Sequence, residues 1–179
     1  DSLKKAADKT YNFLENLLYW SRSQRGSIVY EPENINLNEL VVENIELLKT
    51  MIDNKRIEVD NSLEEDISAY ADRNMVKTII RNLLYNAVKF TREEGSIKVY
   101  SNPEKQHVRV FVEDNGVGIT PDNIKKILNR KKYFTTYGTE REKGSGLGLN
   151  LIFDFLKKNK GKIDIEGFTL PTGSYLSSQ

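Results

Sequence analysis

The sequence has 179 residues, and its 27 lysines and arginines nearly balance its 26 aspartates and glutamates, for a formal net charge of +1. This balance argues against a dedicated nucleic-acid binder, and a hydrophobic content of 38% argues against wholesale disorder. The absence of cysteine and the single histidine exclude a disulfide framework, thiolate catalysis and any site built mainly from imidazoles.

The first 25 residues carry a heptad pattern of apolar and small side chains, formed by Leu3, Ala6, Thr10, Phe13, Leu17 and Trp20. This pattern predicts a bundle helix, although a helix lying on its own domain would show the same spacing. Gly26 and Pro32 interrupt it, so we expect a linker over residues 26–35. No apolar run reaches the roughly 18–20 residues of a membrane span, and the start lacks Met and a signal-type stretch, so we expect a part of a longer protein.

Two longer helices are predicted next. Asn36 is a suitable N-cap for an amphipathic segment that runs to about Asn54. Asp72 caps a second segment, which ends near Thr91. The broad apolar face of this second helix consists of Val76, Ile79, Ile80, Leu83, Leu84, Ala87 and Val88.

The other predicted elements are mainly short strands. They cover residues 57–59, 67–71, 97–100, 108–112 and 162–166, with helices after Thr120 and from about Gly146 to Asn159. The third and fourth strands alternate with period two across a turn, which predicts a β-hairpin. Together these elements indicate the α+β class, a two-layer sandwich with helices on one face of a mixed, mostly antiparallel sheet, rather than a doubly wound fold.

Three polar side chains share one face of the second long helix, opposite its apolar stripe. Asn82, Asn86 and Lys89 follow one another at intervals of four and three residues. A solvated face would explain them, but asparagine is unfavourable inside a helix because its amide competes for backbone groups. An amide oxygen is also a hard ligand, able to take one position of an octahedral Mg²⁺ whose other ligands are phosphate and water.

A second motif, Asp114-Asn115-Gly116-Val117-Gly118-Ile119, directly follows the fourth predicted strand. A simple polar turn would have a similar composition. Two glycines one residue apart nevertheless permit the close approach of a flat ligand. A carboxylate at the end of a strand can accept a hydrogen bond from an exocyclic amine.

A third motif, Gly144-Ser145-Gly146-Leu147-Gly148-Leu149, opens the last predicted helix. Glycines at alternate positions before a helix N-terminus expose backbone N–H groups to an anion, although a flexible loop has the same composition. The motif lacks the Lys-Ser/Thr of a P-loop and the preceding core strand of a dinucleotide-binding fingerprint.

In this order, the three motifs resemble the nucleotide-binding domain of sensor histidine kinases, part of the superfamily shared with gyrase-type, Hsp90-type and mismatch-repair ATPases. Residues 82–91 are similar to the family's N box, and residues 114–119 and 144–149 to its two glycine boxes. The resemblance covers about residues 36–179 and implies the Bergerat ATP-binding fold. Residues 1–25 resemble the second helix of the dimerisation bundle that precedes this domain.

The resemblance also implies a role for each motif residue. Asn86 would bind the Mg²⁺ that bridges the ATP phosphates, Lys89 would offset phosphate charge, and Phe90 would lie against the adenine. Asp114 would accept a hydrogen bond from the adenine amino group, next to a backbone that Gly116 and Gly118 leave open. The other implied ATP contacts are Gly144, Gly146, Leu147 and Gly148 around the phosphates, Phe134 in a lid over residues 129–143, and Ser174 at the base.

Asn82 distinguishes members of the superfamily. The hydrolysing ATPases carry a glutamate at the equivalent position, which acts as a general base on water. An amide has no useful basicity near neutral pH, so we expect slow hydrolysis of ATP and transfer of its γ-phosphoryl group to a protein imidazole.

The acceptor histidine is expected outside this chain, on the first bundle helix. The only histidine, His107, stands at the start of a predicted strand, and we expect it to be a surface residue that is not phosphorylated. The implied partners are the bundle of a homodimer and a response regulator, without nucleic acid or direct membrane contact. The implied location is cytoplasmic, in a membrane-anchored bacterial receptor.

Two alternatives remain open: a serine-kinase type anti-sigma regulator and a non-catalytic, nucleotide-dependent interaction module. The predicted bundle helix argues against the first, and the preserved motif side chains argue against the second. The chain also departs from the family, with Asn159-Lys160-Gly161 in place of His-Gly-Gly and a divergent tail over residues 167–179. These departures could weaken nucleotide binding.

Overall fold

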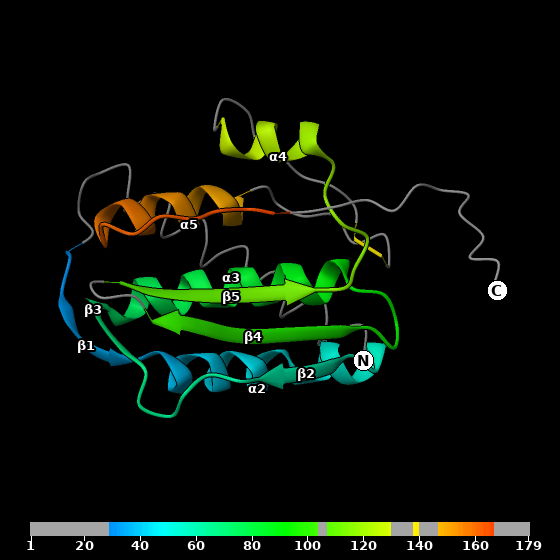
Figure 1. Ribbon diagram of the computed structural model, residues 1–179, viewed down its shortest axis with the longest axis horizontal. Helices are drawn as coiled ribbons and strands as arrows, with labels where there is room; N and C mark the ends of the chain where they lie inside the picture. The colour runs from blue at the N-terminus through cyan, green and yellow to red at the C-terminus, as the bar shows by residue number, and fades with distance from the viewer. Residues whose placement is uncertain (1–28, 104–106, 130–137, 140–146, 167–179) are drawn as a thin grey trace.

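The computed structural model describes residues 29–103, 107–129, 138–139 and 147–166 (Figure 1). The expected bundle helix, most of the expected lid and the divergent tail lie outside these residues. The described elements are β1 (Pro32–Asn36), α2 (Leu37–Lys55), β2 (Glu58–Asn61), β3 (Ser68–Asp72), α3 (Arg73–Phe90), β4 (Ser96–Pro103), β5 (Val108–Asp114), α4 (Pro121–Leu128) and α5 (Leu147–Lys158).

The strands form a mixed sheet system. β2 pairs in parallel with β4, and β4 pairs antiparallel with β5. β1 pairs antiparallel with β3, so the first four residues of β1 form a strand within the expected linker. Residues 162–166 have no regular secondary structure, and the strand predicted there is wrong, because period-two alternation makes a strand only where another strand pairs with it.

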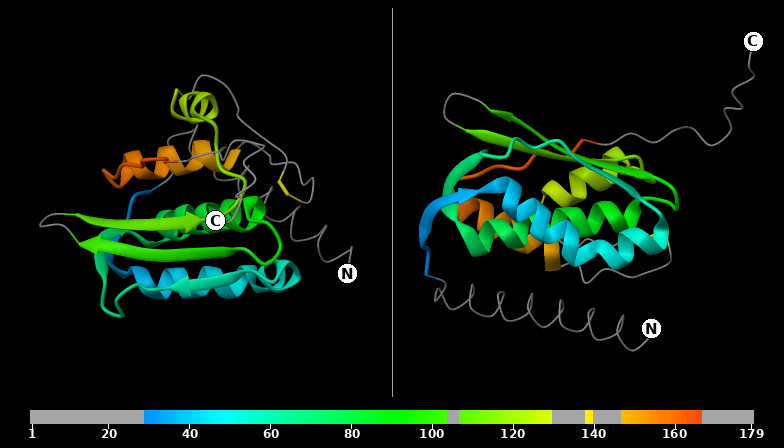
Figure 2. Two further views of the ribbon diagram at one scale, coloured as in Figure 1. Left: turned by 45° about the vertical axis from the view of Figure 1, so that its right-hand side comes forward. Right: turned by 90° about the horizontal axis from the view of Figure 1, so that it is seen from below.

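Helices α2, α3 and α5 lie side by side on one face of the sheet (Figure 2). The main core lies between α2, α3 and the strands, where Leu40, Val88 and Val99 are at most 1% exposed. A second cluster joins α3 to α5 through Met75, Ile79, Leu151, Ile152 and Phe155. This arrangement confirms the predicted α+β class. No helix among the described residues combines the length and apolar character needed to cross a membrane.

Both long helices begin at the predicted caps. The Asn36 side chain accepts from the Glu39 N–H, and Asp72 Oδ1 accepts from the Met75 N–H, each at 3.0 Å. Each contact satisfies one of the N–H groups that the first turn of a helix leaves without a partner. The second Asp72 oxygen accepts from the Glu31 N–H at 3.1 Å, which also fixes the chain ahead of β1.

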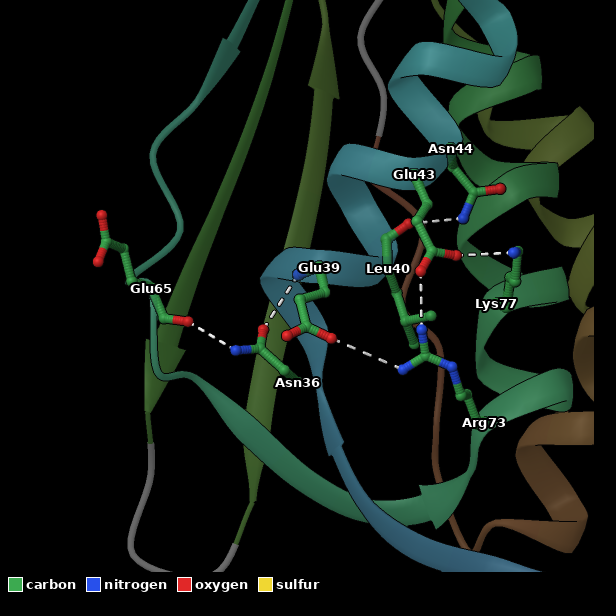
Figure 3. A network of polar contacts seen from close by, with 8 residues as sticks. All are labelled: Asn36, Glu39, Leu40, Glu43, Asn44, Glu65, Arg73 and Lys77. Atoms are coloured by element: carbon green, nitrogen blue, oxygen red, sulfur yellow. Dashed lines mark hydrogen bonds and ion pairs between the residues drawn. The ribbon is translucent and has the colours of Figure 1, made fainter.

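An ion-pair network on the surface locks the relative position of α2 and α3 (Figure 3). The Glu43 carboxylate accepts from Arg73 and from Lys77, each at 2.7 Å. The hydrogen bond from Lys77 is the largest contribution that lowers the pKa of Glu43, and the charges of Lys77 and Arg73 lower it further. Since α3 carries the first motif, this network helps to fix the helix on which the candidate site is built.

Candidate functional site

The polar face of α3 begins with Asn82, whose amide is held by its own helix. Asn82 Nδ2 donates to the Thr78 carbonyl oxygen at 2.8 Å. This is the local side-chain contact with the helix backbone that makes asparagine unfavourable inside a helix, and it fixes the orientation of the amide. A Cβ atom added to Gly148 would lie 2.4 Å from Asn82 Oδ1. The first turn of α5 therefore packs directly on Asn82, which brings the first and third motifs together.

Asn86 lies one turn further along α3 and is half-buried. Its amide oxygen has the hard-ligand character that Mg²⁺ prefers. Among the described residues, no group of three or more His, Cys, Asp or Glu side chains could hold a metal ion. A single amide oxygen on this face of α3 fits a magnesium ion that would take its other ligands from phosphate and water.

The C-terminal end of α3 places a positive charge on an aromatic ring. Lys89 is 3% exposed, and its Nζ lies 4.7 Å from the centroid of the half-buried Phe90 ring. A cation–π contact of this kind contributes about 0.5–1 kcal/mol at exposed sites and more where water is excluded. The ammonium is thus held close to Phe90 instead of extending into solvent.

The first glycine loop rests on this same end of α3, and both α3 and β5 end on the right-hand side of Figure 1. The Val117 N–H donates to the Phe90 carbonyl oxygen at 3.1 Å. A Cβ atom on Gly116 would lie 2.3 Å from that same oxygen, so only glycine permits the contact. Gly118 has a φ of 69°, which glycine adopts without strain. The loop therefore depends on both glycines, for different reasons.

Asn115 joins this loop to the sheet, a role that its place in the motif did not reveal. Its side-chain Oδ1 accepts from the Ser96 N–H at 2.8 Å, and its own N–H donates to the Ser96 carbonyl oxygen at 3.2 Å. Gly95, just before β4, would place a Cβ atom 2.7 Å from Asn115 Oδ1. These contacts fix the loop between β4 and the end of α3.

Asp114 lies at the end of β5, and Gly116 packs against both its carboxylate and the Phe90 carbonyl oxygen. Asp114 Oδ1 accepts from the Gly116 N–H at 3.0 Å. Desolvation is the largest contribution that raises the pKa of the Asp114 carboxyl, and the charge of Glu113 raises it further. The Gly116 N–H opposes the rise because it stabilises the ionised form. A carboxylate with a raised pKa is a strong acceptor, suited to a donor on a ligand.

The structure describes the second glycine box only in part. Leu147 begins α5, and Gly148 packs on Asn82. The other predicted contacts, Phe134, Gly144, Gly146 and Ser174, lie outside the described residues. The structure thus brings Asn82 together with Gly148, and the Phe90 carbonyl oxygen together with Gly116 and Val117 of the first glycine loop.

A cavity of about 350 Å³ opens beside the end of α3, and Lys55, Arg92, Glu93, Val117 and Thr139 line it. Lys55 and Thr139 belong to none of the three motifs. Lys55 was not identified from the sequence, although the position of this lysine in the sequence is unusual. Lys55 follows Leu48 by seven residues and Ile52 by three, so it falls in the apolar stripe of α2, where a charge is unexpected.

Comparison with known proteins defines the family. Residues 71–175 match the family model described as histidine kinase-, DNA gyrase B-, and HSP90-like ATPase. The chain belongs to this family, and the proteins similar to it include histidine kinases and the catalytic domain of one of them. The identification made from the three motifs is confirmed.

The chain matches only a part of the curated relatives to which it is similar. It is 31% identical over 156 residues to sporulation kinase A of Bacillus subtilis, an alignment that covers 86% of this chain and 24% of that protein. The structure of the catalytic domain of histidine kinase ThkA is 32% identical, with a TM-score of 0.62 over 72% of this chain and 82% of that one. A complex of ThkA with the response regulator TrrA also matches, at 32% identity and a TM-score of 0.57 over 77% of this chain and 42% of that one. The chain thus spans about a quarter of the length of sporulation kinase A.

Proposed function

We propose that this chain is the catalytic domain of a two-component sensor kinase, which binds Mg-ATP and transfers its γ-phosphoryl group to a histidine. The observation that carries the proposal is the meeting of the first glycine loop with the end of α3, where the Val117 N–H donates to the Phe90 carbonyl oxygen. This contact joins the loop that carries a carboxylate acceptor (Asp114) to the end of the helix that carries an aromatic ring (Phe90) and a buried cation (Lys89). These are the groups that an adenine base and its phosphates require.

The residues of the site would contact different parts of the bound nucleotide. Asp114 would accept from the adenine amino group, and Phe90 would lie against the base. Asn86 would supply one ligand to Mg²⁺, which when bound neutralises phosphate charge, and Lys89 would add to that neutralisation. The start of α5 at Gly148 would direct backbone N–H groups to the phosphates, with Phe134, Gly144, Gly146, Leu147 and Ser174 as further predicted contacts.

Asn82 favours transfer over hydrolysis. Its amide donates to Thr78 and faces Gly148, and an amide cannot take a proton from water at neutral pH. The chain would therefore mainly position and neutralise the phosphates, while the acceptor imidazole supplies the nucleophile. In that step the imidazole nitrogen bonds to the γ-phosphorus, the bond from that phosphorus to the β,γ-bridging oxygen breaks, and ADP leaves.

The wider context is part of the same proposal. The acceptor histidine would belong to a dimerisation bundle, of which residues 1–25 would be one helix, and residues 129–143 would form a lid over the nucleotide. A response regulator would receive the phosphoryl group on an aspartate, in line with the ThkA complex. We also propose a cytoplasmic location in a membrane-anchored receptor.

Incubation with γ-labelled ATP and a separately produced bundle that carries the acceptor histidine tests this function. We expect acid-labile label on the bundle, because phosphohistidine is acid-labile, and little free phosphate without the bundle. His107→Gln is the matched control, and it should transfer label like the wild type because His107 is an exposed residue directly before β5.

Three results would contradict the proposal. Brisk release of phosphate without the bundle would indicate a hydrolase. Acid-stable label on a partner hydroxyl would indicate a serine kinase of the anti-sigma type. Tight binding of ATP with no transfer to any bundle would indicate an interaction module.

A further inference from the structure

Lys55, the last residue of α2, buries its charge in the candidate site. It is 3% exposed. Its Nζ lies 2.8 Å from the Val88 carbonyl oxygen, 3.1 Å from that of Lys89 and 3.2 Å from that of Thr91. A fourth acceptor, Thr139 Oγ1, lies at 2.7 Å. A buried charge is costly unless hydrogen bonds surround it, and here every N–H of the ammonium has an acceptor in reach.

These contacts place Lys55 as a cap on the C-terminal end of α3. The last carbonyl groups of a helix lack donors within the helix and carry a partial negative charge. A lysine ammonium supplies both donors and positive charge to these carbonyl groups. A capping lysine often belongs to the last turn of the helix that it caps, whereas Lys55 belongs to α2. The end of α3 that Lys55 caps is the end that carries Lys89 and Phe90.

Thr139, from a segment far from α2 in the sequence, also contacts Lys55 and the carbonyl groups at the end of α3. Its N–H donates to the Lys89 carbonyl oxygen at 3.2 Å. Its hydroxyl accepts from Lys55 and lies 3.1 Å from the carbonyl oxygens of both Lys89 and Thr91, either of which can take its single proton. In the sequence, Thr139 stands five residues before Gly144 of the second glycine box.

The backbone of Lys55 is held as well. Its carbonyl oxygen accepts from the Glu94 N–H at 2.8 Å. Both the ammonium group and the backbone carbonyl group of Lys55 are therefore held, the first by carbonyl groups at the end of α3 and the second by the Glu94 N–H in the turn that follows α3. With Thr139 and Val117 it also lines the cavity beside the first glycine loop.

We propose that Lys55 and Thr139 are positioning residues for the nucleotide. Their contact holds the end of α3, and with it Lys89 and Phe90, in register with the first glycine loop, although neither residue belongs to a nucleotide-binding motif. This inference rests on the proposed function. It adds that affinity for Mg-ATP depends on a lysine of α2 through the backbone of α3.

Two variants of Thr139 distinguish the contribution of its hydroxyl group from that of the rest of its side chain. Thr139→Val keeps the volume and removes the hydroxyl, whereas Thr139→Ser keeps the hydroxyl. We expect the affinity for Mg-ATP to fall about tenfold in Thr139→Val, the change that loss of a hydrogen bond of about 1.4 kcal/mol produces, and to change by less than about threefold in Thr139→Ser. Titration calorimetry measures both.

Hydrogen exchange at the end of α3 supplies a second readout in the nucleotide-free protein. The Thr91 N–H donates to the Ala87 carbonyl oxygen at 2.9 Å. We expect this amide to exchange faster in Thr139→Val and in Lys55→Met, while the amides near the start of α3 keep their protection. Lys49→Met is the matched control, because it removes from the same helix an exposed lysine that pairs with Asp53 on the surface, and it should leave both readouts unchanged.

The double variant Lys55→Met/Thr139→Val completes the test. It should bind Mg-ATP little more weakly than Lys55→Met alone, since the two residues act through one contact. If Lys55→Met does not fold, the pair of Thr139 variants decides. Wild-type affinity and protection in Thr139→Val, or equal losses in Thr139→Val and Thr139→Ser, would overturn the inference alone. A wild type that binds no Mg-ATP would overturn the proposed function, and this inference with it.

Discussion

Replacing Gly116 with alanine is expected to weaken binding of Mg-ATP by up to about a hundredfold and to destabilise the domain. The added Cβ atom would lie 2.3 Å from the Phe90 carbonyl oxygen, a backbone atom of α3 that cannot rotate aside, and 2.7 Å from Asp114 Oδ1. The loop must therefore move off α3. That shift would break the Val117–Phe90 hydrogen bond and move Asp114 away from the adenine, and losing a hydrogen bond to a charged acceptor, about 1.5–3 kcal/mol, gives up to roughly this factor.

Thermal unfolding and calorimetric titration check this expectation. Overpacking typically costs about 1–3 kcal/mol, and each kcal/mol lowers Tm by roughly 2–4 °C in a domain of this size. Gly161→Ala is the matched control, because its Cβ atom would meet only the movable end of the Leu156 side chain, at 2.9 Å. If Gly116→Ala bound Mg-ATP as well as Gly161→Ala, the first glycine loop would not be part of the site.

Asp114→Asn is expected to lower affinity for ATP about tenfold to a hundredfold, because a hydrogen bond to a charged acceptor contributes about 1.5–3 kcal/mol. The same variant should discriminate less against GTP. Guanine carries an acceptor oxygen where adenine carries its amino group, and an asparagine side chain can donate to that oxygen whereas a carboxylate cannot. Competition between ATP and GTP for the wild type and the variant measures this change. Equal loss of affinity for both nucleotides would contradict base recognition by Asp114.

The pH dependence follows from the raised pKa of Asp114. An ionised carboxylate is a stronger acceptor for the adenine amino group than a protonated one, so affinity should fall as the pH drops through this raised pKa. That fall would come at a higher pH than for an ordinary aspartate, and Asp114→Asn should remove it. The stability of the fold depends on pH in the opposite direction, since it should rise as the pH drops through this pKa. Because folding raises the pKa, the ionised form is less favourable in the folded state, so Asp114→Asn should be as stable as the wild type or more stable at neutral pH.

Local patterns in the sequence were sufficient for the helices. The caps at Asn36 and Asp72 and the apolar stripes behind them predicted α2 and α3, and both begin where expected. Period two predicted the β4–β5 hairpin, which forms. β1 was not predicted, because its five residues show no alternation and become a strand only through pairing with β3, more than thirty residues later in the chain.

The candidate site shows the same limit of local reasoning. Spacing placed Asn82 and Lys89 on one face of a helix, but it could not show that Gly148 packs on Asn82 or that Gly116 touches the end of α3. The contact of Lys55 with the same end of α3 also depends on tertiary packing, which brings the last residue of one helix to the last turn of another. Its position in an apolar stripe was a signal, since a charge is buried there only when acceptors surround it.

Titration calorimetry of the wild type and Asn86→Ala, with and without magnesium, tests whether the chain binds ATP through Mg²⁺ on the Asn86 face of α3. We expect the wild type to bind ATP much more tightly with magnesium than without it, and Asn86→Ala to lose this difference while its Tm stays close to that of the wild type. A wild type without binding at millimolar nucleotide, or an Asn86→Ala variant with undiminished magnesium-dependent binding, would rule out this site.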